Sequence, residues 1–97
     1  MPDLRITPSD RFRSDTRELL GDERWQTISS GFEWTLRRSA ELGQKVRGTQ
    51  DLRVYPIYPG DGHVYIVYYR ILGDEIILKS MVKRHTPVSP RVLDFED

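Results

Sequence analysis

The chain has 97 residues, and a domain of this length buries roughly two-thirds of its unfolded surface and can fold without covalent cross-links. It contains no cysteine, which excludes disulfides, thiolate metal sites and a thiol nucleophile. Its 15 basic and 15 acidic residues give no net charge, so nucleic-acid binding would have to rely on a local basic patch.

A short strand and a first helix are predicted at the N-terminus. Residues 3–7 alternate polar and apolar side chains before Pro8, as an edge strand does. Thr7 followed by Pro8 matches an N-cap residue and a proline in the first helical position, so a helix should start there and run to about Leu20. Gly21 stands where a left-handed C-cap belongs.

A second helix is predicted from an N-cap at Asp22 to Gly43. Its apolar residues recur at helical spacing and should cover one face of a sheet: Trp25, Ile28, Phe32, Leu36 and Ala40. Trp34 lies off this stripe. We expect it to make a partly buried contact with the first helix, and the alternative is an anchor for a partner protein.

After a polar connector at residues 44–50, a three-stranded antiparallel meander is predicted. Its strands are Leu52–Tyr58, His63–Leu72 and Glu75–Lys83, separated by glycine-containing turns. The middle strand is apolar almost throughout, which indicates a central strand covered on both faces. Leu52 and Val54 are expected to face the helices, which leaves Arg53 on the opposite face.

The whole chain is therefore interpreted as one α+β domain, residues 1–97, with a core at 4–85 and a tail at 86–97. A short helix is predicted at Arg91–Glu96. We expect this acidic tail to dock beside the helices, and the alternative is that it folds over the open face of the sheet and masks it.

The order β, α, α, β, β, β resembles the RelE/ParE superfamily of bacterial toxins from type II toxin–antitoxin pairs. The similarity covers about residues 4–85 and is best in GQKVRGTQDLRVYPI, GHVYIVYYRI and EIILKSMVKR. It implies a short strand and an antiparallel helix hairpin packed on one face of an antiparallel sheet. It also implies a RelE-like, ribosome-dependent mRNA endonuclease that inhibits translation, with a cognate antitoxin as partner and a homodimer or toxin–antitoxin hetero-oligomer as the assembly.

The resemblance points to particular residues. Arg53 lies where such ribonucleases carry a basic residue on the first meander strand, and Arg84 lies where they carry an arginine at the end of the last. Tyr55 lies where a second lysine is common. The family's arginine in the middle of the central strand is missing here, as is the tyrosine that follows Arg84 in several members, and His85 is the only titratable substitute nearby.

RNA cleavage by the 2′-hydroxyl needs a base, cations around the phosphate and an acid for the leaving oxygen, but no metal. We expect Arg53, Arg84 and His85 to be the catalytic residues. Substrate-binding roles are expected for Tyr55, Lys83 and His63. Each of these residues also has a purely structural interpretation, as a solvated strand or turn residue.

Two other functions stay open. The chain also resembles the ParE branch, which acts on DNA gyrase without nuclease residues, and a non-toxic scaffold for protein interactions is the third hypothesis. No cofactor is expected. His63 and His85 are 22 positions apart with no third ligand suggested, which argues against a metal site. No apolar run approaches the roughly 20 residues of a membrane span, so we expect a cytoplasmic protein.

Overall fold

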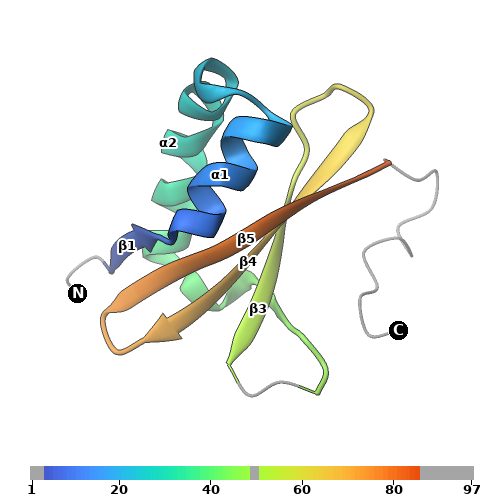
Figure 1. Ribbon diagram of the computed structural model, residues 1–97. Helices are drawn as coiled ribbons and strands as arrows, with labels where there is room; N and C mark the ends of the chain where they lie inside the picture. The colour runs from blue at the N-terminus through green and yellow to red at the C-terminus, as the bar shows by residue number, and fades with distance from the viewer. Residues whose placement is uncertain (1–3, 49–50, 86–97) are drawn as a thin grey trace.

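A computed structural model describes residues 4–48 and 51–85, and it has two helices lying on one face of a five-stranded mixed sheet (Figure 1). The strand order is β1-β5-β4-β3-β2, in which β1 runs parallel to β5 and every other pair is antiparallel. The elements are β1 (Arg5–Pro8), α1 (Asp10–Leu19), α2 (Asp22–Arg38), the 3₁₀ helix η1 (Ala40–Leu42), β2 (Gln44–Lys45), β3 (Leu52–Ile57), β4 (His63–Leu72) and β5 (Glu75–His85). The predicted α+β class and the central position of β4 are confirmed. The expectation of a wholly antiparallel sheet is wrong, because β1 joins the edge of the sheet parallel to β5.

The first helix begins later than predicted. Ser9 is its N-cap, because the Ser9 hydroxyl oxygen accepts a hydrogen bond from the Phe12 backbone N–H at 3.0 Å. Pro8 instead closes β1, where it pairs with Leu78 of β5. A proline suits an edge strand because such a strand can spare one backbone donor. The parallel pairing with β5 therefore outcompetes the helical start that Thr7 and Pro8 suggested.

Gly21 joins the two helices. With φ at 86°, it takes a conformation that costs other residues free energy, and its N–H donates to the carbonyls of Thr16 (3.0 Å) and Arg17 (3.1 Å). The predicted end of α1 is thus confirmed. Gly21 is also the N-cap of α2, so Asp22 is the first helical residue and not the cap. The second helix ends at Arg38, five residues before Gly43, and η1 fills most of the interval.

The apolar stripe of α2 forms the core as predicted. Phe32 and Leu36 of α2 and Ala40 of η1 are buried, and Trp25 and Ile28 pack against the same core. The Trp25 ring lies 5.5 Å from Phe12 of α1 and 5.8 Å from Phe32, between ring centroids. Trp34 is not partly buried as expected. Its side chain is 59% exposed, and the Arg38 guanidinium lies 4.6 Å above its ring.

The sheet buries apolar residues on both faces. Directly opposed residues of neighbouring strands share a face. On β4, Tyr65, Val67 and Tyr69 belong to the cluster under the helices, whereas Val64 and Ile66 form a second cluster with Val54. All five β4 residues are at most 1% exposed, so the predicted cover on both faces is confirmed.

The predicted orientation of β3 is wrong. Arg53 pairs with Tyr69 and Tyr55 pairs with Val67, so both lie on the helix-covered face, and Val54 lies on the other. Residues 52–57 have apolar side chains at both odd and even positions. Burial of Tyr55 and Ile57 beneath the helices determines which set of side chains faces the helices. The predicted connector also contains a short strand, because Gln44 and Lys45 pair with Val54 and Arg53.

The predictions for the tail, including a helix at Arg91–Glu96, lie outside the described residues. Within 4–48 and 51–85, no helix is long and apolar enough to cross a membrane.

Candidate functional site

The two histidines of the chain meet at one end of the β4–β5 ladder. His63 begins β4 and His85 ends β5, and the two are direct partners in the register. Their ring centroids are 5.1 Å apart and the ring planes are inclined by 31°. We call these two residues the histidine pair. The antiparallel return of β5 along β4 therefore joins two residues that are far apart in sequence.

Asp61, in the turn before β4, fixes the position of His63. One carboxylate oxygen, Oδ1, accepts a hydrogen bond from the His63 backbone N–H at 3.0 Å and lies 3.7 Å from the His63 Nδ1 atom. The other oxygen, Oδ2, accepts hydrogen bonds from Arg24 Nη2 (2.8 Å) and the Tyr65 hydroxyl (2.7 Å). Asp61 thereby links the loop before β4 to Arg24, in the first turn of α2, and to Tyr65 on β4.

These contacts set the charges around the histidine pair. The hydrogen bond from Arg24, followed by that from Tyr65, holds the pKa of Asp61 well below its usual range. The same bond to Asp61 raises the pKa of Arg24. Burial, with a further contribution from Asp61, raises the pKa of the Tyr65 hydroxyl. A negative carboxylate and a neutral phenol therefore stand beside His63 across the physiological pH range.

The two nitrogens of His63 have different surroundings. Its side chain is 27% exposed, yet Nδ1 is buried and makes no hydrogen bond within the described parts of the chain. The group facing Nδ1 is the Asp61 carboxylate, at a distance slightly too long for a hydrogen bond. The exposed part of the His63 side chain therefore does not include Nδ1, and His85 beside it is exposed.

Of the two basic residues at the end of β5, one joins the histidine pair. Lys83 is opposite Tyr65 and shares a face with His85, whereas Arg84 is opposite Val64 on the other face. Both side chains are exposed. The structure therefore brings together three of the six residues expected at the site, namely His63, Lys83 and His85.

Arg53 and Tyr55 lie elsewhere and have structural contacts. The Arg53 Nη1 atom donates to the backbone carbonyls of Gly43 (2.8 Å) and Glu41 (3.2 Å), which belong to η1 and the residue after it. Tyr55 packs its ring 5.7 Å from that of Phe32. Arg53 and Arg84 are on opposite faces of the sheet, so these two expected catalytic residues are not brought together. The ring of Tyr55, expected to bind substrate, is partly buried against the core.

Three residues beside the histidine pair were missed by the sequence reasoning: Arg24, Asp61 and Tyr65. The alternation Asp61, His63, Tyr65 was a usable signal, since alternate residues of a strand share a face. Arg24 could not have been found in this way, because its contact with Asp61 depends on how α2 packs. In the described residues no group of three or more His, Asp or Glu side chains is placed to hold a metal ion.

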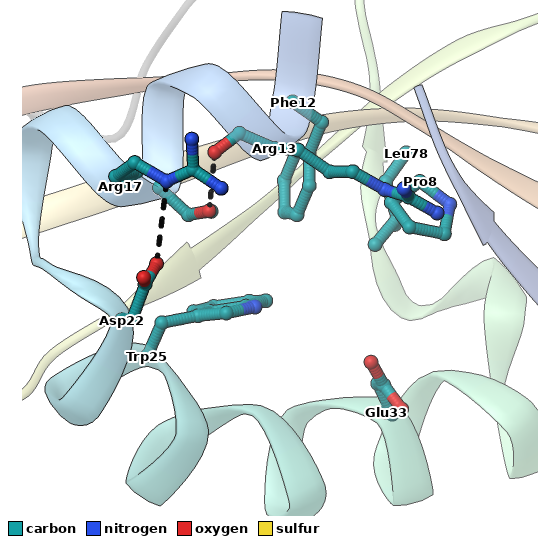
Figure 2. A pocket seen from close by; sticks show the side chains of 9 residues that line it. Pro8, Phe12, Arg13, Arg17, Asp22, Trp25, Glu33 and Leu78 are labelled. Carbon is teal, nitrogen blue, oxygen red and sulfur yellow. Dashed lines mark hydrogen bonds and ion pairs between the residues drawn. The ribbon is translucent and has the colours of Figure 1, made fainter. Parts of the chain in front are cut away.

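A separate hollow lies between the two helices (Figure 2). It has a volume of about 220 Å³ and is lined by the apolar side chains of Phe12, Trp25 and Leu78 together with charged residues that include Arg17 and Asp22. Arg17 and Asp22 form an ion pair at 3.6 Å, drawn as a dashed line in the figure. Ligand pockets usually hold about 300–1,000 Å³, and none of the expected site residues lines this hollow. The histidine pair is the better candidate.

No protein-family model matches the chain, and no curated protein matches it in sequence.

Proposed function

We propose that this chain is the toxin of a type II toxin–antitoxin pair and acts as a RelE-like, ribosome-dependent mRNA endonuclease that inhibits translation. Its cognate antitoxin is the expected partner. The proposal is supported by the element order, since one strand, two helices and an antiparallel meander follow one another over residues 4–85, the region of the resemblance. It is further supported by the packing of both helices on a single face of the sheet (Figure 1).

The observation that carries the enzymatic part of the proposal is the contact between His63 and His85, 5.1 Å apart between ring centroids. Imidazoles are the side chains best suited to exchange protons near neutral pH. One neutral imidazole takes the proton of the 2′-hydroxyl, and the other, protonated, gives a proton to the leaving 5′-oxygen. Lys83, on the same face, offers a cation to the phosphate.

The test is induction of the protein in a bacterial host that lacks the antitoxin. His63→Gln and His85→Gln should each lower mRNA cleavage by about 10²-fold or more, because general acid–base groups contribute roughly 10²–10⁴ to a rate. Arg5→Gln is the matched control, since Arg5 forms an exposed ion pair with Asp74 at the far end of the sheet. Undiminished cleavage in the double histidine variant would contradict the ribonuclease assignment.

A ParE-like toxin that inhibits DNA gyrase is the second candidate. It is favoured by the contacts of Arg53 and Tyr55. Both residues were expected at the ribonuclease site, but Arg53 binds the Gly43 carbonyl and Tyr55 packs on Phe32. Measuring both bulk translation and plasmid supercoiling after induction separates the two toxins. Loss of supercoiling with translation initially intact supports gyrase as the target, and a protein that changes neither is a non-toxic scaffold.

A further inference from the structure

The histidine pair gathers every strong transition-metal donor that this chain has. The sequence contains two histidines and no cysteine, so imidazole nitrogen is available nowhere else and thiolate is absent. Imidazole is the ligand type that suits Zn²⁺, Cu²⁺ and Ni²⁺ among divalent ions, whereas carboxylates alone favour Mg²⁺ and Ca²⁺. The spacing of 22 residues in the sequence had argued against a metal site, but the strand register removes that objection.

The separation of the rings fits a shared ion. Zinc–nitrogen bonds of about 2.0–2.1 Å in a tetrahedral site put the centroids of two ligating imidazoles roughly 5 Å apart. The observed centroid distance is 5.1 Å. Both residues sit on adjacent strands of the ladder, so their backbones are already held in place and little conformational freedom is lost on binding.

Asp61 prepares His63 for this role. Metal-binding histidines usually direct one ring nitrogen at a carboxylate or carbonyl and bind the ion with the other. The His63 Nδ1 atom is buried and faces the Asp61 Oδ1 atom at 3.7 Å, which leaves Nε2 as the ring nitrogen for an ion. The Asp61 carboxylate is itself held by Arg24 and Tyr65, and its orientation is therefore fixed before any ion arrives.

We propose that His63 and His85 together bind one divalent transition-metal ion of the Zn²⁺, Ni²⁺ or Cu²⁺ class, with Asp61 as a positioning residue. Water completes the coordination, because no third side chain in the described part of the chain is placed to ligate. Two protein ligands make this an open, exchangeable site. Its affinity should follow the usual order, in which Cu²⁺ binds more tightly than Zn²⁺ and Ni²⁺.

The experiment uses the full chain without an affinity tag and does not involve RNA, so its outcome is independent of the proposed nuclease activity. Isothermal titration with ZnCl₂, NiCl₂ and MgCl₂ should give one site for the first two and no binding for the third. His63→Gln and His85→Gln should each weaken Zn²⁺ binding at least tenfold. Arg84→Gln is the matched control, since Arg84 neighbours His85 on β5 but lies on the other face, and it should bind Zn²⁺ as the parent does.

A second readout counts the ligands. The electron paramagnetic resonance spectrum of bound Cu²⁺ should show coupling to two imidazole nitrogens in the parent and to one in either histidine variant. Circular dichroism establishes that both variants are folded. The proposal is overturned if the parent binds no Zn²⁺ at millimolar concentration, if a single-histidine variant keeps the parent's affinity, or if the copper spectrum of the parent shows only one imidazole.

Discussion

The contact between Tyr69 and the end of η1 makes a quantitative prediction possible. The Tyr69 hydroxyl is buried, donates to the Ala40 carbonyl at 2.6 Å and accepts from the Gly43 N–H at 3.0 Å. Tyr69→Phe deletes this hydroxyl and leaves a buried carbonyl and a buried N–H without partners. Each unsatisfied group costs about 1–3 kcal/mol, so we expect the free energy of unfolding to fall by about 2–6 kcal/mol.

Gly43 is tied to the same hydroxyl. A Cβ atom built at Gly43 would lie 2.2 Å from the Tyr69 hydroxyl oxygen and 2.8 Å from two ring carbons. Gly43 has φ at −67°, which any residue tolerates, so the cost of Gly43→Ala comes from this collision alone. Overpacking of this kind typically costs about 1–3 kcal/mol.

The two substitutions should therefore not be additive. In the Tyr69→Phe background the closest collision is gone, so the double variant should be more stable than the sum of the single losses predicts, by about 1 kcal/mol or more. Urea denaturation of the parent, both single variants and the double variant measures this coupling. Losses that add to within about 0.3–0.5 kcal/mol, the scatter seen for independent sites, would refute the contact.

Three further outcomes are expected. Phe32→Ala should cost about 3–5 kcal/mol in urea denaturation, because the ring lies buried between Trp25 and Tyr55, and an unchanged midpoint would contradict this packing. Arg53→Ala should lower stability by about 1–2 kcal/mol through loss of its bonds to η1, whereas Arg84→Ala should cost under about 0.5 kcal/mol, and equal losses would rule out the structural role of Arg53. Because the pKa of Asp61 is lowered in the folded chain, its contribution to stability is present above the unfolded value of about 3.9 and is lost as the pH falls below it. Thermal melts from pH 7 to pH 2 should therefore show a smaller acid-induced decrease for Asp61→Asn than for the parent, and parallel curves would contradict the assignment.

Local signals in the sequence predicted most of the elements. The helical spacing from Trp25 to Ala40 and the turn at Gly73 each depend on residues close in the chain, and the structure has the expected helix face and a direct Leu72–Glu75 pairing across the turn. The start of α1 was missed because it depends on the pairing of β1 with β5, a strand that follows much later. The short strand β2 was missed because its two residues, Gln44 and Lys45, are both polar and give no alternating pattern. The preference of Thr7 and Pro8 for a helix start was weaker than the pairing of the four residues of β1 with β5.

The face of Arg53 could not be decided from alternation. The strand Leu52–Ile57 carries apolar side chains at both parities, so either face could have been the one beneath the helices. Only the helix positions resolve this, because Phe32 of α2 lies above Tyr55. The resemblance assigned roles by position in the sequence and did not indicate which face of the sheet each residue occupies. Arg53 and Tyr55 were therefore expected at the ribonuclease site, although they lie away from the histidine pair.

The histidine pair depends on a single irregularity in β5. From the tight turn, Leu72 pairs with Glu75, and an unbroken ladder at that register would place Arg84 opposite His63. A bulge at Lys79 shifts the register by one residue between Tyr68 and Tyr69, so that His85 takes this position instead. The spacing of the buried residues of β5 reflects this shift. Ile76 and Leu78 are two residues apart, as in a regular strand, whereas Leu78 and Met81 are three apart.

The first helix holds this bulge in place. The Lys79 carbonyl accepts a hydrogen bond from the Ser9 hydroxyl at 2.9 Å, and the Met81 N–H donates to the Asp15 carboxylate at 3.0 Å. Ser9 is also the N-cap of α1, so the residue that starts the helix satisfies the backbone group that the bulge leaves free of the ladder. Docking of α1 on β5 therefore stabilises the register that brings His63 and His85 together, although neither histidine belongs to a helix.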